Sequence, residues 1–143
     1  MSNYVSRSVQ DTEAFAAQYA QSLHAGDVIA LFGGLGMGKT AFVRGLASGL
    51  HSSSEVSSPT FALVHEYDGK YPIYHFDMYR VRDLDDLYST GFFDYLESGG
   101  IVVIEWSENI EPYLPENARK IRICRTEHEN ERRLTVEDED TGR

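Results

Sequence analysis

The fold is decided by the stretch Val28-Ile29-Ala30-Leu31-Phe32-Gly33-Gly34-Leu35-Gly36-Met37-Gly38-Lys39-Thr40. Its first five residues form an uninterrupted apolar run, which is typical of a strand buried on both faces of a parallel sheet. After the glycines, residues 40–50 are predicted to form a helix whose inner side carries Phe42, Val43, Leu46 and Leu50. The stretch therefore predicts a buried strand, a glycine-rich loop and a helix in that order.

The glycine-rich loop matches the pattern of Gly, four residues, Gly, Lys, then Ser or Thr. Such a loop suits a triphosphate, because close approach of backbone N–H groups needs residues without a Cβ atom, and a helix N-terminus favours anions. Lys39 is expected to reach the β- and γ-phosphates, and the Thr40 hydroxyl to bind Mg²⁺. The residues expected to contact the nucleotide are Gly33, Gly34, Leu35, Gly36, Met37, Gly38, Lys39, Thr40 and Ala41.

Helices and strands alternate along the rest of the chain. A first helix is expected from a cap at Asp11 to about Ala25, with Gly26 as its stop. Further strands are expected at 60–67 and 71–76, joined as a hairpin, at 101–104, and at 121–124 and 134–136, with helical structure at 83–97 broken near Gly91. This order predicts an α/β fold, a P-loop NTPase-like three-layer sandwich with a central mixed, largely parallel sheet and flanking helices, as one unit over residues 1–143.

Composition narrows the classes of function. The 143 residues carry 13 Lys and Arg against 23 Asp and Glu, a formal net charge of -10, which opposes direct binding to DNA or RNA. Cys124 is the one cysteine, so no internal disulfide is expected. No apolar run approaches the roughly 18 residues of a membrane span, and no signal-peptide pattern opens the chain. A cytoplasmic protein without membrane contact is expected.

Two acidic residues follow predicted strands. Glu105 comes directly after the apolar run 101–104 and can hold the water shell of a magnesium ion or polarise the attacking water. The alternative without a function is a glutamate at the end of a strand that faces solvent. Asp77 closes the strand 71–76 and can hold a magnesium-bound water or act as a base. Arg80 can neutralise phosphate charge or pair with a carboxylate, and both readings stay open.

Four further residues lie in or near these motifs, and three of them, His75, Tyr79 and Thr60, have two readings each. His75 and Tyr79 can serve the same polar cluster or be packing residues with satisfied polar atoms. Trp106 is expected to pack in the core beside Glu105, near the nucleotide. Thr60, in a polar loop, can contact the γ-phosphate or make a cap or turn.

The combination of motifs resembles the bacterial TsaE family, formerly called YjeE. Four segments carry the resemblance, which spans nearly the whole chain: Gly33 to Thr40, Ser58-Pro59-Thr60-Phe61, His75-Phe76-Asp77-Met78-Tyr79-Arg80 and Glu105-Trp106-Ser107-Glu108. Members of that family are small ATPases needed to make N6-threonylcarbamoyladenosine beside the anticodon of tRNAs reading codons that start with A.

The resemblance implies roles for particular residues and for partners. It implies that Lys39, Asp77 and Glu105 are catalytic, that Thr40, Asp77 and Glu105 hold Mg²⁺, and that Thr60 belongs to a switch-like loop. It further implies ATP as the nucleotide and docking on a complex of the TsaB and TsaD proteins, so that tRNA is reached only indirectly. Family members usually carry an acidic residue at the position of Gly34 and often Ala at that of Met37, a difference that bears on affinity.

Other classes of phosphate-loop protein carry sequence features of their own. A small-molecule kinase normally has an arginine-rich lid, which the sequence does not show. A GTPase needs an Asn-Lys-x-Asp sequence, which is absent from the chain. A regulatory module that binds ATP and signals by docking, with little hydrolysis, stays open as an alternative.

Overall fold

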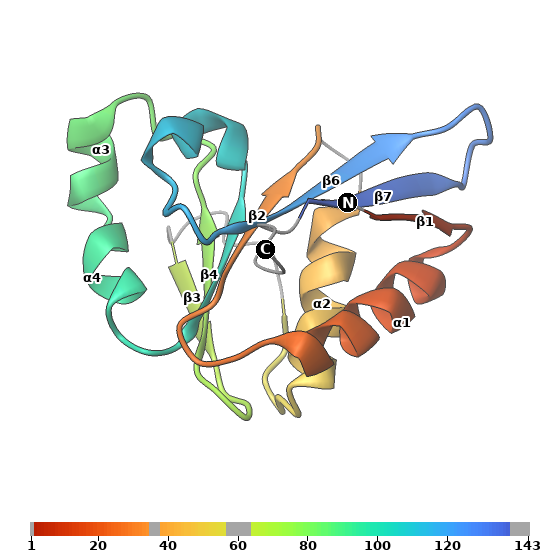
Figure 1. Ribbon diagram of the computed structural model, residues 1–143, viewed down its shortest axis with the longest axis horizontal. Helices are drawn as coiled ribbons and strands as arrows, with labels where there is room; N and C mark the ends of the chain where they lie inside the picture. Colours follow the sequence, from red (N-terminus) through yellow and green to blue (C-terminus); the bar gives the residue numbers. More distant parts are fainter. Residues whose placement is uncertain (1, 35–37, 57–63, 138–143) are drawn as a thin grey trace.

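The structure is a computed structural model that describes residues 2–34, 38–56 and 64–137 (Figure 1). Seven strands form one sheet in the order β1-β7-β6-β2-β5-β4-β3. The strands are β1 (Ser2–Ser6), β2 (Val28–Phe32), β3 (Val64–Tyr67), β4 (Ile73–Asp77), β5 (Ile101–Glu105), β6 (Arg119–Arg125) and β7 (Arg132–Glu137). The helices are α1 (Val9–Tyr19), α2 (Lys39–Gly49), α3 (Leu84–Ser89) and α4 (Phe92–Leu96), with the 3-10 helices η1 (Ala20–Ser22) and η2 (Ser107–Tyr113).

The centre of the sheet is parallel and its flanks are antiparallel. β2 pairs in parallel with both β5 and β6, and β5 pairs in parallel with β4. The pairs β1–β7, β6–β7 and β3–β4 are antiparallel. Every residue of β2 and β5 is buried, as expected for strands covered on both faces. The predicted mixed sheet with its buried central strands is confirmed.

Helices cover both faces of the sheet, which makes three layers. In Figure 1, α1 and α2 lie together at the lower right, and α3 and α4 lie together at the left. Successive strand residues point to opposite faces. Ile101 and Val103 of β5 therefore pack in the cluster that holds α2, whereas Val102 and Ile104 pack in the cluster that holds Leu87 and Phe92 of α3 and α4.

The beginning of the chain differs from the prediction. Ser8, not Asp11, caps α1: the Asp11 N–H donates to Ser8 Oγ over 3.0 Å, and the Asp11 carboxylate accepts from the Arg7 N–H over 2.9 Å. The predicted end near Ala25 is also wrong, because α1 gives way to η1 after Tyr19. Strand β1 was not predicted, since it is a mostly polar edge strand without an apolar run.

Other predicted elements agree with the structure. β3 and β4 form the expected antiparallel hairpin, although residues 60–63 of the predicted first strand lie outside the described residues. The helical stretch 83–97 is broken at Gly91, whose φ of 79° is left-handed and favours glycine. Strands β6 and β7 pair across the predicted charged turn, though both are longer than expected. Of the described helices, none has the length and apolar character needed to cross a membrane.

Helices α1 and α2 pack closely because glycines of α2 face α1. A Cβ atom on Gly45 would lie 2.7 Å from the Cβ atom of Ala16 and would also collide with the backbone carbonyl of Glu13. We expect Gly45→Ala to lower the free energy of unfolding by about 1–3 kcal/mol, the usual cost of overpacking, because a backbone oxygen cannot move aside cheaply. Urea denaturation would measure it.

Ser48→Ala is the matched control for this substitution. Ser48 lies on the same helix but is exposed, so the added helix propensity of alanine should leave stability unchanged or slightly higher. Equal denaturation midpoints for Gly45→Ala and the unchanged protein would contradict the close packing of α1 on α2.

Candidate functional site

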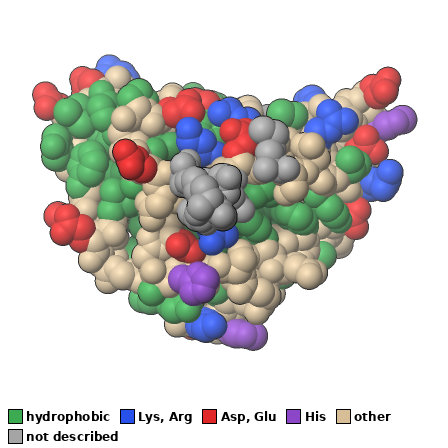
Figure 2. Space-filling model, viewed as in Figure 1, with side chains coloured by type: hydrophobic (Ala, Val, Ile, Leu, Met, Phe, Trp, Pro, Cys, Tyr) green, Lys and Arg blue, Asp and Glu red, His purple; other side chains and the backbone are tan. Residues whose placement is uncertain are grey.

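Three parallel strands end at one edge of the sheet, and each leads to a predicted site residue. β2 runs into Gly33, β5 ends at Glu105, and β4 ends at Asp77. In the register of β4 and β5, Asp77 lies directly opposite Glu105. The carboxyl ends of parallel strands are where open α/β sheets bind ligands. In Figure 2, acidic and basic side chains gather at the top centre, along this edge, while hydrophobic side chains gather over α3 and α4 at the left.

Lys39 is the first residue of α2 and lies at the same edge. Gly38 precedes it with a φ of 100°, a left-handed conformation that favours glycine. The Lys39 side chain is buried; its Nζ donates to the carbonyl oxygen of Gly33 over 2.7 Å and lies 4.0 Å from the centre of the Trp106 ring. The ammonium group therefore lies against the Gly33 carbonyl, on the face of an aromatic ring.

Burial shapes the electrostatics of this lysine. It lowers the pKa of Lys39 below the ordinary value of 10.5, because a desolvated ammonium is disfavoured. The charges of Glu105, Glu108 and Asp77 act in the opposite direction and stabilise the ammonium. At this edge of the sheet the buried Lys39 ammonium therefore lies in the field of three carboxylates, and two of these are the predicted Asp77 and Glu105.

Glu105 is buried, so the reading of a strand-end glutamate facing water is wrong. The residue is 4% exposed, and its Oε2 lies 2.6 Å from Nε2 of His75. His75 is fully buried, and its other ring nitrogen, Nδ1, lies 2.9 Å from the hydroxyl of Tyr67. His75 is therefore a buried residue with a partner at each ring nitrogen, and through Glu105 it also belongs to the polar cluster.

Asp77 is half-buried beside Glu105. Its Oδ1 accepts the backbone N–H of Tyr79 over 2.8 Å. Burial raises the pKa of Asp77 above the ordinary 3.8, and the neighbouring charge of Glu105 raises it further; the Tyr79 hydrogen bond, His75 and Lys39 act in the opposite direction. Holding this carboxylate ionised therefore costs folding free energy.

We expect Asp77→Asn to raise the thermal unfolding midpoint of the nucleotide-free protein at neutral pH. The asparagine oxygen still accepts from the Tyr79 N–H, and no negative charge is then buried beside Glu105. In the pH window between the ordinary pKa of 3.8 and the raised folded value, the folded state binds more protons than the unfolded state. The stability of the unchanged protein therefore falls as pH rises through that window and stays lowered above it.

The stabilisation by Asp77→Asn should accordingly shrink as pH falls and vanish below the ordinary aspartate pKa. Scanning calorimetry from about pH 3 to about pH 8 would measure this dependence. Asp94→Asn, at an exposed position in α4, is the matched control and should show no such gain. A midpoint at neutral pH that is the same with and without Asp77 would contradict the prediction.

Two contacts at the edge were not predicted from the sequence. Glu108 Oε2 accepts the backbone N–H of Gly33 over 2.9 Å, joining η2 to the start of the glycine loop. Trp106 has a left-handed φ of 60°, rare for a residue with a side chain, and its half-buried ring meets Tyr79 edge-on with centroids 5.1 Å apart. The only signal for Glu108 was its place in the motif 105–108, because 75 positions separate it from Gly33.

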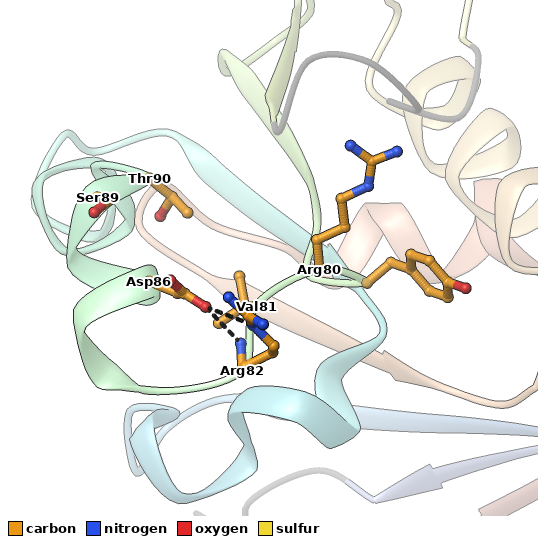
Figure 3. A pocket seen from close by; sticks show the side chains of 7 residues that line it. Arg80, Val81, Arg82, Asp86, Ser89 and Thr90 are labelled. Carbon is orange, nitrogen blue, oxygen red and sulfur yellow. Dashed lines mark hydrogen bonds and ion pairs between the residues drawn. The ribbon is translucent and has the colours of Figure 1, made fainter.

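Arg80 borders a cavity of about 870 Å³ between the end of β4 and α3. The cavity is lined by Tyr79, Arg80, Val81, Arg82, Asp86, Ser89 and Thr90. Arg82 pairs with Asp86 over 3.5 Å, and the guanidinium group of Arg80 points away from that pair (Figure 3). Among the residues described, no carboxylate pairs with Arg80, so its reading as a plain ion-pair residue gains no support. Tyr79 is 61% exposed, so the reading of Tyr79 as a packing residue is wrong.

The remaining predicted positions divide into described and undescribed ones. Thr40, half-buried, and Ala41, buried, follow Lys39 in the first turn of α2, and Gly34 is exposed after Gly33. The predicted contacts at Leu35, Gly36, Met37 and Thr60 lie outside the described residues.

The donors at the edge suit magnesium held largely by phosphate and water. Thr40, Asp77 and Glu105 offer hydroxyl and carboxylate oxygens, the hard donors that Mg²⁺ prefers. In ranges 2–34, 38–56 and 64–137, no three His, Cys, Asp or Glu side chains gather closely enough to hold a metal ion by themselves. The protein groups therefore fit an ion that a bound triphosphate brings with it.

Comparisons with known proteins agree on one family. The family model described as "Threonylcarbamoyl adenosine biosynthesis protein TsaE" matches residues 6–134. A protein of Treponema pallidum (strain Nichols) named tRNA threonylcarbamoyladenosine biosynthesis protein TsaE is 40% identical over 132 residues, covering 92% of this chain and 97% of that protein. A Bacillus subtilis (strain 168) protein of the same name is 39% identical over 127 residues, covering 88% of this chain and 78% of that protein.

A solved structure has the same fold. The crystal structure of Bacillus subtilis YdiB matches with a TM-score of 0.79 and 34% sequence identity, covering 94% of this chain and 83% of that one. The predicted P-loop NTPase-like α/β sandwich is therefore confirmed at the level of the fold.

Proposed function

Because the chain belongs to the TsaE family of threonylcarbamoyl adenosine biosynthesis proteins, we propose that it is a magnesium-dependent ATPase serving that tRNA modification. The modification that it would serve is N6-threonylcarbamoyladenosine, beside the anticodon of tRNAs that read codons starting with A. The proteins it would assist are TsaB and TsaD, whose complex carries out the transfer, while hydrolysis of ATP by this chain resets that complex.

The observation that carries the proposal is the meeting of Lys39 with Asp77 and Glu105 at the carboxyl edge of the sheet. A cation at the start of a helix and two carboxylates on neighbouring parallel strands are the parts that hydrolysis of a nucleoside triphosphate requires. The carboxylates face the same side of the sheet as α2, since Ile101 and Val103 of the same strand pack against that helix.

Each group has a distinct task in this proposal. Lys39 releases Gly33 and binds the β- and γ-phosphates, and backbone N–H groups at the start of α2 bind the phosphate oxygens. Glu105 would orient the attacking water and accept its proton, and Thr40 and Asp77 would hold the magnesium ion and its water. The ion, when bound with ATP, would neutralise the charge that builds up on the phosphates.

The charge of the chain supports contact with tRNA through protein partners. A formal net charge of -10 repels a phosphate backbone, so the TsaB and TsaD proteins would have to carry the tRNA contacts. Docking on them would also complete a site that, in isolation, hydrolyses slowly. A small-molecule kinase would instead transfer the phosphate to an acceptor.

The test is a phosphate-release assay with Mg-ATP, run on the chain alone and with TsaB and TsaD from the same organism. We expect slow release alone, faster release with both partners, and an ATP-dependent complex in size-exclusion chromatography. ATP labelled at the γ-phosphate separates release to water from transfer to an acceptor. Absence of phosphate release in every combination would overturn the ATPase, and failure to form a complex would overturn the partnership.

A further inference from the structure

A buried chain of polar groups crosses three neighbouring strands beneath the carboxyl edge. Tyr67 ends β3, His75 lies in β4, and Glu105 ends β5. These three residues are 5%, 0% and 4% exposed. The Tyr67 hydroxyl lies 2.9 Å from His75 Nδ1, and His75 Nε2 lies 2.6 Å from Glu105 Oε2.

The two ring nitrogens of His75 have different partners. A carboxylate oxygen is an acceptor, so Nε2 of His75 is the donor to Glu105. Nδ1 faces the Tyr67 hydroxyl, which can act as donor or acceptor and also lies 3.4 Å from Nδ1 of His65. The imidazole is therefore held at both nitrogens, with Nε2 directed at the carboxylate.

Packing alone gives no reason for this polar chain. The residue of β5 opposite His75 is Val103, which is fully buried and apolar, and Ile73 lies two residues earlier on the same face of β4. Burying three polar side chains costs desolvation that apolar residues of similar volume would avoid. The imidazole leans along the strand to reach Glu105, two positions beyond its direct neighbour.

The polar chain leaves one carboxylate oxygen available. Glu105 Oε2 is bonded to His75, whereas Oε1 makes no hydrogen bond to any residue in the described parts of the chain. Fixing Oε2 fixes the plane of the carboxylate and hence the direction in which Oε1 can act. Partners of this kind orient functional ligands in many enzymes, and their loss usually costs 10- to 100-fold in activity.

We propose that Tyr67 and His75 are positioning residues for Glu105: the phenol holds the His75 ring at Nδ1, and the imidazole aims the free oxygen of the carboxylate at the attacking water. This inference rests on the proposed hydrolysis of ATP for its effect on rate. The contacts of the histidine ring are independent of that activity.

The first experiment uses Tyr67→Phe, which removes one hydroxyl and keeps the ring in the core. We expect kcat for ATP hydrolysis to fall about 10-fold, with KM and the calorimetric affinity for ADP unchanged, because phosphate binding does not involve this residue. Tyr71→Phe is the matched control, since Tyr71 lies on the same hairpin and packs against the same core, and its kcat should not change. An unchanged kcat in Tyr67→Phe would overturn the proposal.

A double-mutant cycle separates positioning from a structural role. His75→Gln should lower kcat in the unchanged protein but have no further effect once Glu105 is replaced by Gln, because both substitutions then disable the same carboxylate. A structural role would instead lower the residual activity again in the double variant. His24→Gln, at an exposed histidine, controls for loss of a histidine as such.

Nitrogen NMR of the His75 ring tests the geometry without any turnover, with His75→Gln identifying the signals. We expect a protonated Nε2 in the unchanged protein and in Tyr67→Phe, and a shifted Nδ1 signal in Tyr67→Phe, which lacks the hydroxyl beside that nitrogen. An unprotonated Nε2 in the unchanged protein would overturn the proposal. If the unchanged protein releases no phosphate, the proposed ATPase activity is overturned. The NMR measurement still tests the contact of His75 with Glu105.

Discussion

Replacing Lys39 with alanine is expected to lower kcat/KM for ATP hydrolysis by about 100- to 1,000-fold, the usual effect of losing one charged donor at a developing anion. The ammonium is already buried at the mouth of the glycine loop, 2.7 Å from the Gly33 oxygen, so it reaches phosphate by a short movement and needs little further desolvation. Because ground-state ATP contacts the same group, calorimetric affinity for ATP should fall as well.

Lys70→Ala is the control for this loss. Lys70 is exposed at the turn of the β3–β4 hairpin, where its Nζ lies 5.5 Å from the Tyr71 ring centre, and its removal should leave hydrolysis and binding unchanged. Hydrolysis by Lys39→Ala at the rate of the unchanged protein would rule out the phosphate role of Lys39. Circular dichroism would establish that both variants are folded.

Glu105→Gln is expected to separate chemistry from binding. The amide keeps the size of the side chain, and its oxygen still accepts from Nε2 of His75, so the polar chain beneath the edge survives. The substitution would remove the proposed base for the proton of water, a contribution of about 100- to 10,000-fold in kcat. Calorimetric affinity for ATP should stay within a few-fold, in contrast to Lys39→Ala.

The control for Glu105→Gln is Glu116→Gln, the same chemical change at an exposed position before β6. It should leave kcat unchanged. A full rate in Glu105→Gln would exclude the carboxylate as the base and leave Asp77 as the acidic residue to test next.

The sequence predicted the centre of the fold better than its rim. β2 and β5 are buried on both faces, so each contains an unbroken apolar run from which a buried strand can be predicted. Strand β1 has no such signal, because an edge strand needs only one apolar face and its residues are mixed. The cap of α1 was misplaced at Asp11 because Ser8 and Asp11 are both capping types, and only the backbone geometry at Ser8 distinguishes them.

Candidate site residues could be predicted where a motif or the end of one strand marks them. Contacts that depend on how two strands pair could not be predicted. Lys39 is specified by its motif, and Glu105 and Asp77 by their positions after apolar strands. That His75 would hold Glu105 depends on the register of β4 against β5, which periodicity does not contain. The contact of Glu108 with Gly33 likewise arises only when η2 folds back on the glycine loop.

The stacking of Lys39 on Trp106 makes the protein carry its own optical probe. Trp106 is the one tryptophan of the chain, so no other indole contributes to the tryptophan fluorescence. The ammonium group of Lys39 lies 4.0 Å from the centre of its ring. The energy of an excited indole depends on nearby charge, and withdrawal of the ammonium toward an anion would shift the emission. Binding of an anion beside Lys39 would then be followed by tryptophan fluorescence, in unlabelled protein and in real time.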